Sequence, residues 1–412
     1  MLTRLGFPSV GEHRRFVTAI AVDALGSGVF MPLSMLYFLA VTPLSLLEVG
    51  TAISVASLVS LPSGPVIGVL VDRWGAKSVL LAGNALQAVG FAAYLFADSF
   101  GSVLLWTIVV TLGRTAFWGS YGNIVTAISR PGEREKWFGF LGALRNVGFA
   151  VGGLASGAAL AIGTETAFGA VVAINAATYA LAFLLLLSVP DAHPAAGRSL
   201  PGTWGTVLAD RPYRLLMVAQ IGYSLPMMIL NFALPVYVVE VAHLPGWLVG
   251  VIFTVNCLMV GLGQGLVVNA MTGRVRFRIL LLTQALFATS YLVFLGAGAL
   301  TVAVAVVVMV LGGMVYTLAE LTGGPVLAAL AAEAAPDHLR GRYLSLIQPA
   351  WNLSSTVAPV TFAWLLERGE APLWLVMIGV AGLSALVAAR LGASMPRAAA
   401  RVTNAAEEPV TL

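Results

Sequence analysis

Apolar residues in this chain are grouped into long runs, and short polar connections separate them. Twelve such runs cover residues 16–41, 47–70, 78–97, 101–124, 138–162, 167–189, 214–238, 247–270, 279–298, 301–331, 343–366 and 372–391. A helix needs ~20 apolar residues to cross the hydrocarbon core of a bilayer. Only structures that satisfy their own backbone hydrogen bonds are stable there. The pattern therefore predicts an all-α membrane protein with twelve transmembrane helices.

The composition agrees with a membrane protein. Of the 412 residues, 59% are hydrophobic and only 10% are charged, whereas a soluble protein carries about 25% charged residues. This composition excludes a soluble enzyme, a nucleic-acid-binding protein and a disordered regulator. Cys257 is the single cysteine, and the four histidines are scattered in polar connections. We therefore expect no disulfide, no metal site and no cofactor.

The positive charges are distributed unevenly along the chain. Nineteen of the 22 Lys and Arg residues lie in the N-terminal segment, in every second connection and in the C-terminal segment. Arg368 is on the opposite side, and Arg114 and Arg145 lie inside apolar runs. Because cytoplasmic connections are enriched in Lys and Arg, we expect both termini in the cytoplasm and a multi-pass protein of the inner (cytoplasmic) membrane. This topology explains the net positive charge without a nucleic-acid partner.

The longest polar connection divides the runs six and six. Similar short sequences end the second and the eighth run, at Gly68–Asp72 and Gly265–Asn269, which indicates duplicated halves. We therefore expect two pseudo-symmetric six-helix bundles joined by a cytoplasmic linker. The predicted divisions are 1–189 for the first bundle, 190–213 for the linker, 214–392 for the second bundle and 393–412 for a cytoplasmic tail.

The connection after the second run, residues 68–77, has the sequence GVLVDRWGAK. It combines glycines that permit a sharp turn with one carboxylate and two cations at the membrane interface. The sequence resembles the signature loop of the major facilitator superfamily, with Ala76 in place of one basic residue. The resemblance covers essentially the whole chain and implies the two-bundle fold of that superfamily. It also implies a cytoplasmic gate formed by Gly68, Asp72, Arg73, Gly75, Lys77 and Arg134.

Arg114 lies midway along the fourth apolar run. An arginine at this depth costs at least ~2.5 kcal/mol on insertion scales, so it should face a cavity or a counter-charge. The position resembles the Arg-x-x-Gln-Gly motif of proton-coupled members of the superfamily, although no Gln follows and Gly119 is one residue late. The alternative is a purely structural buried ion pair.

Four glycines recur at helical spacing in the fifth run: Gly148, Gly152, Gly153 and Gly157. Small residues at this spacing let helices pack closely, which is a sufficient explanation for them. The spacing also resembles the antiporter motif of drug/proton exchangers, with Gly153 in place of a proline and Ser156 in place of a glycine. This resemblance favours export over import.

Two acidic residues lie inside apolar runs, Asp23 in the first and Glu320 in the tenth. A buried carboxyl group holds its proton tightly and a nearby arginine weakens that hold, so alternation between these environments would bind and release a proton. In the superfamily, spans one, four, seven and ten line the central cavity, and Asp23, Arg114 and Glu320 lie on three of them. We expect Asp23 and Glu320 to carry protons and Arg114 to tune Asp23. Each acid could instead be a permanently ionised structural partner of Arg114 or Arg145.

Other polar and aromatic residues inside the runs are candidates for lining a substrate cavity, or for packing and helix–helix hydrogen bonds. They are Tyr37, Trp118, Tyr223, Asn231, Asn256, Tyr316, Gln348 and Trp351.

These features predict a monomeric, proton-coupled exporter of small amphipathic or cationic compounds, of the multidrug efflux type, working by alternating access. Its partners would be a small-molecule substrate, protons and the lipid bilayer. The alternatives are a dedicated exporter of one metabolite, natural product or lysolipid, and a proton-coupled nutrient symporter. A non-transporting receptor or a membrane-embedded enzyme is a different class. We expect no enzyme, because the sequence contains no clustered nucleophile and base and no metal-binding constellation.

Overall fold

The computed structural model of the protein describes residues 10–129, 134–189, 211–333, 347–394 and 400–402, and its regular elements are helical. Most of the predicted linker 190–213 and tail 393–412 lies outside the described residues. In chain order the α-helices are α1 (Arg14–Phe30), α2 (Ser34–Val41), α3 (Leu46–Ser60), α4 (Ser63–Trp74), α5 (Ala76–Tyr94), α6 (Phe100–Ile128), α7 (Arg134–Ile162), α8 (Glu165–Leu187), α10 (Arg211–Met227), α11 (Leu234–Val236), α12 (Trp247–Met271), α13 (Arg276–Ala297), α14 (Val302–Glu333), α16 (Ile347–Leu366) and α17 (Glu370–Ser394).

Each predicted apolar run contains helical residues. Among the described residues, nine helical stretches are long and apolar enough to cross a membrane. A tenth is formed if α3 and α4, which are bent by 48° relative to each other, make one broken span. The prediction of an all-α, multi-pass membrane protein is therefore confirmed.

Prolines mark the interruptions of the long helices. A 3-10 turn that contains Pro32 separates α1 from α2, and Pro62 precedes α4 at the bend after α3. Pro226 stands near the end of α10, and π-helical turns follow it on both sides of α11. Proline removes a backbone donor and clashes with the preceding turn, so the regular ladder of hydrogen bonds is broken at these positions.

The chain divides into two compact units by its contacts. The first contains Met1–Ser199, Leu230–Gly261 and Thr356–Glu367, and the second contains Leu200–Ile229, Leu262–Ser355 and Arg368–Leu412. In this grouping, parts of α12 and α16 belong with the N-terminal helices. The predicted division at 190–213 stays a prediction.

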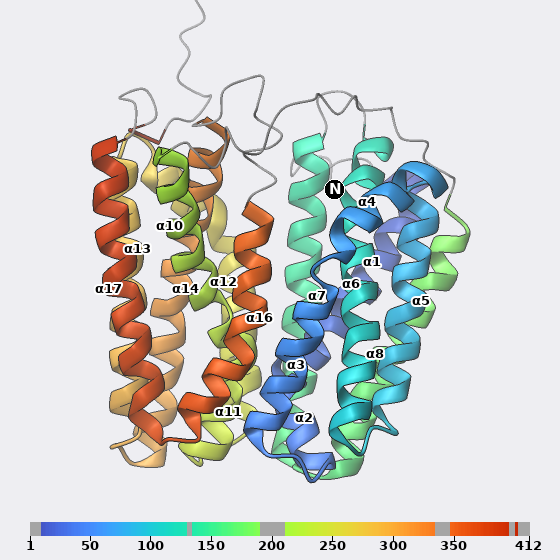
Figure 1. Ribbon diagram of the computed structural model, residues 1–412, viewed down its shortest axis with the longest axis horizontal. Helices are drawn as coiled ribbons and strands as arrows, with labels where there is room; N and C mark the ends of the chain where they lie inside the picture. Colours follow the sequence, from blue (N-terminus) through green and yellow to red (C-terminus); the bar gives the residue numbers. More distant parts are fainter. Residues whose placement is uncertain (1–9, 130–133, 190–210, 334–346, 395–399, 403–412) are drawn as a thin grey trace, which may run out of the picture. The chain divides into compact units, whose positions relative to one another are not determined.

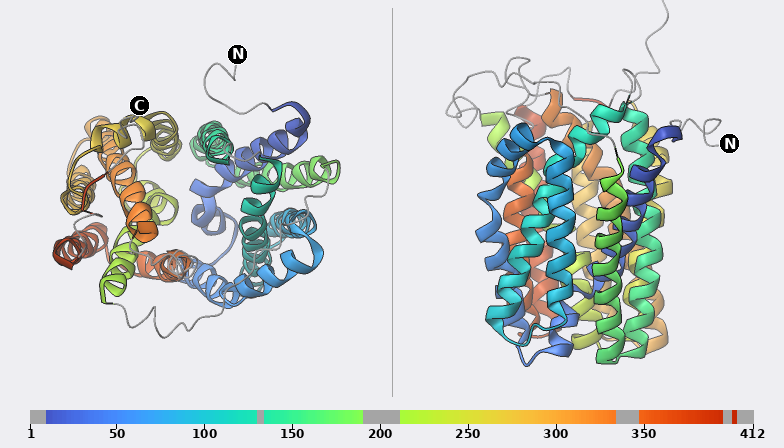
Figure 2. Two further views of the ribbon diagram at one scale, coloured as in Figure 1. Left: turned by 90° about the horizontal axis from the view of Figure 1, so that it is seen from above. Right: turned by 90° about the vertical axis from the view of Figure 1, so that its right-hand side faces the viewer.

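Small residues permit close helix packing in the first unit. Here α1 packs on α7 and α8, while α5 packs on α6 and α8 (Figure 1 and Figure 2). A Cβ atom on Gly28 would lie 2.6 Å from the Phe149 backbone, and one on Gly83 would lie 2.8 Å from the Gly113 carbonyl oxygen. Inside a bilayer such close contacts supply much of the association between helices, because lipid is as apolar as the side chains.

Segments of α12 and α16 complete the first unit. The Leu47 N–H at the start of α3 donates a 2.8 Å hydrogen bond to the carboxylate of Glu367 at the end of α16. Two turns along, the Ser54 hydroxyl accepts a 3.0 Å hydrogen bond from the Val360 N–H. On α12, the Thr254 hydroxyl donates to the Ala150 carbonyl of α7 at 3.0 Å. Hydrogen bonds therefore join these segments to α3 and α7.

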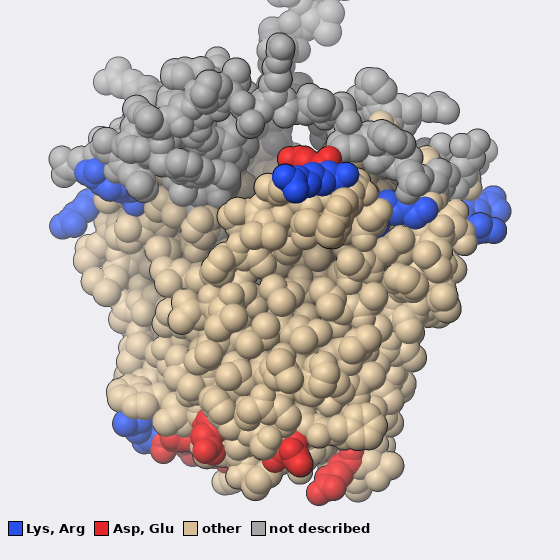
Figure 3. All heavy atoms as spheres, turned by 45° about the vertical axis from the view of Figure 1, so that its right-hand side comes forward, with Lys and Arg blue, Asp and Glu red and all other residues tan. Residues whose placement is uncertain are grey.

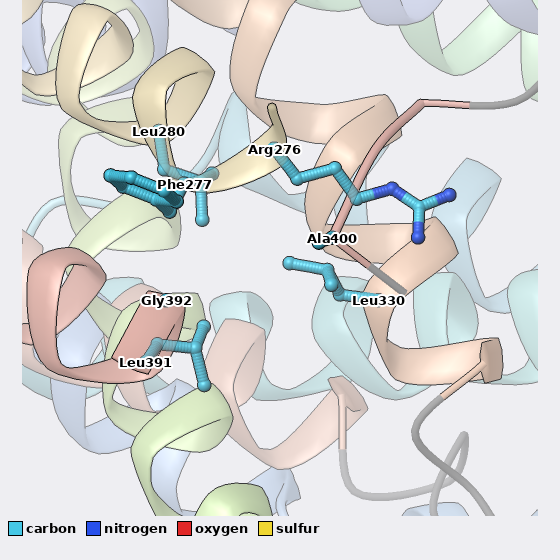
Figure 4. A pocket seen from close by; sticks show the side chains of 7 residues that line it. All are labelled: Arg276, Phe277, Leu280, Leu330, Leu391, Gly392 and Ala400. Carbon is cyan, nitrogen blue, oxygen red and sulfur yellow. The ribbon is translucent and has the colours of Figure 1, made fainter. Parts of the chain in front are cut away.

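The second unit is built on α13, which packs on α14 and α17, and on α10, which packs on the same two helices. The segment 400–402 pairs with the connection before α13: the Arg276 N–H donates to the Ala400 carbonyl at 2.9 Å. A small pocket lies beside this pairing, with apolar side chains from α13, α14 and α17 (Figure 4). Its lining residues are Arg276, Phe277, Leu280, Leu330, Leu391, Gly392 and Ala400.

Charged side chains are concentrated near the ends of the helices. On the face shown in Figure 3, Lys, Arg, Asp and Glu lie at the two margins, and a broad band of other residues separates them. Large apolar side chains such as Leu184, Leu262 and Leu383 are exposed on the helices. An exposed apolar surface of this kind suits contact with lipid acyl chains.

Candidate functional site

A buried ion pair lies between α1 and α7. The Asp23 carboxylate is 2.6 Å from Nη1 of Arg145, and their side chains are 4% and 9% exposed. Asp23 therefore pairs with Arg145 and not with Arg114. Taking two charges out of water is expensive, and it is tolerated only where the charges are paired in good geometry. A pair of this kind inside apolar helices is a functional candidate.

Glycines bring α1 and α7 close enough to form this pair. A Cβ atom on Gly148 would lie 2.8 Å from the Ala24 Cβ. A Cβ atom on Gly152 would lie 2.5 Å from the Leu25 carbonyl oxygen. Real Cβ atoms essentially never lie this close to another heavy atom, so a larger residue at either position would push α1 and α7 apart. Both glycines follow Arg145 within two helical turns, and they set the distance between the two charged side chains.

Three aromatic rings surround the guanidinium group of Arg145. Its central carbon lies 4.8 Å from the ring centroid of Trp118, 5.2 Å from that of Phe149 and 5.4 Å from that of Phe117. A cation within ~6 Å of an aromatic face is attracted by the ring quadrupole. Phe117 is buried, whereas Trp118 is 52% exposed. The arginine is thus held between one carboxylate and three rings, and one of these rings, Trp118, is half-exposed.

Arg114 lies on α6 one turn before Trp118, and its side chain is exposed. Within the described part of the chain it forms no ion pair. Tyr94 of α5 and Tyr179 of α8 are close enough to interact with it electrostatically, and the Tyr179 hydroxyl is 2.9 Å from the Ser27 hydroxyl of α1. Arg114 therefore lies beside a polar contact between α1 and α8, and its predicted influence on Asp23 stays a prediction.

The second unit contains a separate group of predicted residues. Glu320 of α14 is partly exposed, and its backbone carbonyl accepts a 2.9 Å hydrogen bond from the Tyr223 hydroxyl. The Tyr223 ring packs edge-on against Trp351 of α16, with a centroid separation of 6.2 Å. The structure thus brings Glu320, Tyr223 and Trp351 together in the second unit. In the first unit, Asp23 and Trp118 both contact the guanidinium group of Arg145.

The other predicted cavity residues are placed as follows. The hydroxyls of Tyr37 and Tyr316 donate to the carbonyls of Tyr94 and Pro226; these helix–helix hydrogen bonds are the alternative role given above. Asn231 accepts a 3.4 Å hydrogen bond from Ser34 through its backbone carbonyl. Asn256 is buried on α12, and the side chain of Gln348 lies outside the described residues. A cavity-lining role for the whole group stays a prediction.

The predicted gate sequence forms the end of α4 and the turn into α5. Asp72 and Arg73 are exposed in the last turn of α4. Gly75 has φ +83°, a conformation that favours glycine, and it separates the two helices. The Lys77 ammonium donates a 3.2 Å hydrogen bond to the Leu187 carbonyl at the end of α8. The side chain of Arg134 lies outside the described residues.

The four glycines of α7 contact two different helices. Gly148 and Gly152 face α1, as described above. On the other side, a Cβ atom on Gly153 would lie 2.7 Å from the Phe253 ring, and one on Gly157 would lie 3.0 Å from the Gly250 Cα atom. The stripe thus permits close packing of α7 on α1 and on α12 at the same time.

Several residues around the ion pair were not predicted as site residues: Arg145, Phe117, Phe149 and Tyr179. Arg145 could have been found as the second cation inside an apolar run. The two phenylalanines and Tyr179 give no signal in the sequence, since aromatic residues on membrane helices most often serve packing.

Comparison with known proteins decides the family. The profile described as Major Facilitator Superfamily matches residues 16–359. The chain belongs to the major facilitator superfamily. Members of this family are transporters rather than enzymes, and the structure agrees with a multi-pass membrane protein.

The proteins with similar sequences include drug-resistance proteins. Multidrug resistance protein MdtH of Photorhabdus laumondii subsp. laumondii is 25% identical over 375 residues, covering 88% of this chain and 90% of that protein. MdtH of an Enterobacter species is 26% identical over 394 residues, covering 92% and 93%. The class G tetracycline resistance protein of Vibrio anguillarum is 25% identical over 185 residues, covering 43% and 46%.

Solved structures of the same fold include transporters with other named substrates. A D-xylose–proton symporter superposes with a TM-score of 0.72 at 14% identity, covering 92% of this chain and 97% of that one. A bacterial homologue of the iron transporter ferroportin, in an inward-facing state, has a TM-score of 0.73 at 15% identity, covering 93% and 99%. At these identities the likeness concerns the fold.

Proposed function

We propose that this chain is a proton-coupled antiporter that exports small amphipathic or cationic compounds by alternating access. The observation that carries the proposal is the buried ion pair of Asp23 and Arg145, with a contact of 2.6 Å between apolar helices. Similarity of the sequence to multidrug and tetracycline resistance proteins supports the export of such compounds.

The pair offers a physical means of coupling. A proton on the Asp23 carboxylate cancels its charge and leaves the Arg145 guanidinium without its counter-ion. A lone buried cation is strongly unfavourable, so the protonated site favours a conformation in which Arg145 reaches water or another partner. Protonation and the position of Arg145 are thereby linked, and a change of protonation drives a conformational change. Glu320 is proposed as a second proton carrier, and Arg114 as the group that tunes Asp23.

We further propose twelve transmembrane helices in two pseudo-symmetric bundles, 1–189 and 214–392, with the linker 190–213, the tail 393–412 and both termini in the cytoplasm. The protein would act as a monomer in the inner membrane. The distribution of charge supports this orientation. Of the 22 Lys and Arg residues, 19 lie in segments assigned to the cytoplasm, and Arg368 lies in a segment assigned to the outer side. The gate would be formed by the residues from Gly68 to Lys77 together with Arg134, and the eight predicted cavity residues would contact substrate.

Transport of a fluorescent cation tests this proposal. Purified protein is placed in liposomes, a pH gradient is imposed, and ethidium movement is recorded for wild type, Asp23→Asn and Glu320→Gln. We expect wild type to move the dye only with the gradient, and each amide variant to lose gradient-dependent transport. Both variants are assayed below their own unfolding temperatures, so that loss of coupling is separated from loss of fold.

The possible outcomes separate the alternatives. Full gradient-driven transport by both amide variants would contradict the assignment of proton carriers. Absence of dye movement in folded wild type would point to a dedicated exporter or a nutrient symporter. Those two are distinguished by whether a proton gradient drives a candidate substrate against or along the proton flow.

A further inference from the structure

We propose that the start of α13, the end of α17 and the tail segment 400–402 form a binding site for one anionic phospholipid. Four exposed arginines supply the charge of this site, and we call them the arginine cluster: Arg274, Arg278, Arg390 and Arg401. Lipid binding here is independent of the proposed export function. The proposed topology places the bound lipid in the cytoplasmic leaflet.

The tail segment holds Arg401 beside the start of α13. Val275 and Arg401 face each other in an antiparallel bridge. The Val402 N–H donates a 3.0 Å hydrogen bond to the Arg274 carbonyl, and Nη1 of Arg401 donates a 2.8 Å hydrogen bond to the Gly273 carbonyl. Backbone pairing therefore brings Arg401 next to Arg274, although the two are far apart in the sequence.

Packing of α17 on α13 adds the other two arginines. A Cβ atom on Gly392 of α17 would lie 2.6 Å from the Phe277 ring of α13, so the two helices are in close contact at this end. Arg278 directly follows Phe277, and Arg390 precedes Gly392 by two residues. The cluster therefore collects positive charge from three segments of the chain at one end of the second unit.

The charge of the cluster is not balanced within the part of the chain that the structure describes. Arg274, Arg278 and Arg390 form no salt bridge with any described residue, and Arg401 donates to a backbone carbonyl. Like charges held close together repel one another, so an anion bound among them relieves this repulsion. Anionic lipids of the cytoplasmic leaflet are attracted by ~1 kcal/mol for each Lys or Arg near the membrane surface.

Exposed leucines lie beside the cluster on both helices. On α13, Leu282 is 47% exposed and follows Arg278 by four residues. On α17, Leu386 is 61% exposed and precedes Arg390 by four residues. Side chains four residues apart share one face of a helix, so each arginine stands at the end of an exposed apolar surface. A lipid with its phosphate at the cluster can place its acyl chains on these surfaces, whereas a soluble anion gains nothing from them.

The small pocket described above lies directly beside the cluster. Phe277 and Leu391 border it on one side, and Leu330 and Ala400 border it on the other (Figure 4). Three of these residues, Phe277, Leu391 and Ala400, are chain neighbours of members of the cluster. Apolar surface next to positive charge matches the junction between the phosphate and the acyl chains of a phospholipid.

The test is lipid binding to the purified full-length protein in detergent, measured by native mass spectrometry. The probes are dioleoyl phosphatidylglycerol, which is anionic, and dioleoyl phosphatidylcholine, which has the same chains and no net charge. We expect wild type to bind the first phosphatidylglycerol molecule about tenfold or more tightly than phosphatidylcholine. Thermal unfolding in detergent confirms that each variant is folded.

Two pairs of substitutions separate a built site from general attraction to a basic surface. Arg278→Gln with Arg390→Gln should weaken phosphatidylglycerol binding about thirtyfold, from about 1 kcal/mol for each arginine. Arg14→Gln with Arg15→Gln removes the same charge from exposed arginines at the start of α1, and it should bind like wild type. If the first pair fails to fold, its two substitutions are measured singly, and each should weaken binding about fivefold.

The contribution of the tail is tested at Val402. Proline lacks the N–H that donates to the Arg274 carbonyl, so Val402→Pro should release Arg401 and weaken phosphatidylglycerol binding about fivefold. Val402→Ala keeps this N–H and should bind like wild type. Both variants retain the whole cluster in the sequence, so a difference between them reports the placement of Arg401 and not the number of charges.

The soluble headgroup distinguishes a lipid from a free phosphodiester as the ligand. Glycerophosphoglycerol carries the same phosphate without acyl chains, and we expect that a large excess of it does not displace phosphatidylglycerol. Displacement would overturn the assignment of a lipid, because the exposed leucines would then contribute nothing to binding.

Three other results would overturn the inference: equal binding of the two lipids by folded wild type, equal losses in the two arginine pairs, or equal binding by Val402→Pro and Val402→Ala. Failure of the proposed export function is distinguishable from all of these. Lipid binding is measured in detergent without substrate or gradient, so liposomes that show no gradient-driven transport would contradict export and leave the lipid site supported.

Discussion

The contact between α1 and α7 can be tested by adding a single methyl group. A Cβ atom on Gly152 would lie 2.5 Å from the Leu25 carbonyl oxygen and 2.5 Å from the Val29 nitrogen. Non-bonded heavy atoms prefer about 3.5 Å or more, so Gly152→Ala must move α1 away from α7 by about 1 Å. Overpacking of this kind typically costs about 1–3 kcal/mol. The shift also stretches the contact between Asp23 and Arg145.

A matched control separates overpacking from helix propensity. Gly142 lies in the same helix with nothing within 4 Å of its Cβ position. Alanine is favoured over glycine in helix interiors by ~0.8–1.0 kcal/mol, and both variants receive this gain. We therefore expect Gly142→Ala to be as stable as wild type or more stable, and Gly152→Ala to fall about 1–3 kcal/mol below Gly142→Ala.

The chain provides its own probe for this measurement. Cys257 is the single cysteine and is buried, so a maleimide dye that fluoresces on reaction with thiols reports thermal unfolding in detergent. Gly152→Ala should react at a lower temperature than Gly142→Ala, and it should transport ethidium more slowly in liposomes. An unfolding temperature of Gly152→Ala equal to or above that of Gly142→Ala would refute the close contact between α1 and α7.

Three further predictions use the same thermal assay. Asp23→Asn should destabilise the protein by about 3 kcal/mol by leaving Arg145 unpaired, and adding Arg145→Gln should restore most of this loss; a double variant no more stable than Asp23→Asn would contradict the ion pair. Gly75→Ala should cost about 1–3 kcal/mol because φ is +83° there, and an unchanged unfolding temperature would contradict that backbone conformation. Tyr223→Phe should cost about 1 kcal/mol by removing its 2.9 Å hydrogen bond to the Glu320 carbonyl, and a neutral effect would show that this bond is not formed in the native protein.

The sequence predicted the helices well because the signal for a membrane helix is local. Each run needs only enough consecutive apolar residues to cross the bilayer, and the backbone then has no alternative to a helix. The turn at Gly75 was also predictable, since glycine and adjacent polar residues mark it directly. The interruption at Pro62, between α3 and α4, was not predicted, although proline is the reason for similar interruptions at Pro32 and Pro226.

The sequence by itself determined that charged residues inside apolar runs required partners, because an unpaired charge at that depth is unfavourable. It left open whether Asp23 pairs with Arg114 or with Arg145. Only the packing of α1 on α7, set by glycines that tolerate backbone contact, decided for Arg145. The same packing placed α6 beside this pair and enclosed the guanidinium group with aromatic rings from α6 and α7. The ion pair joins residues 122 positions apart, and the rings of Phe117 and Trp118 reach Arg145 from a different helix, so these contacts depend on how helices pack and not on any local pattern.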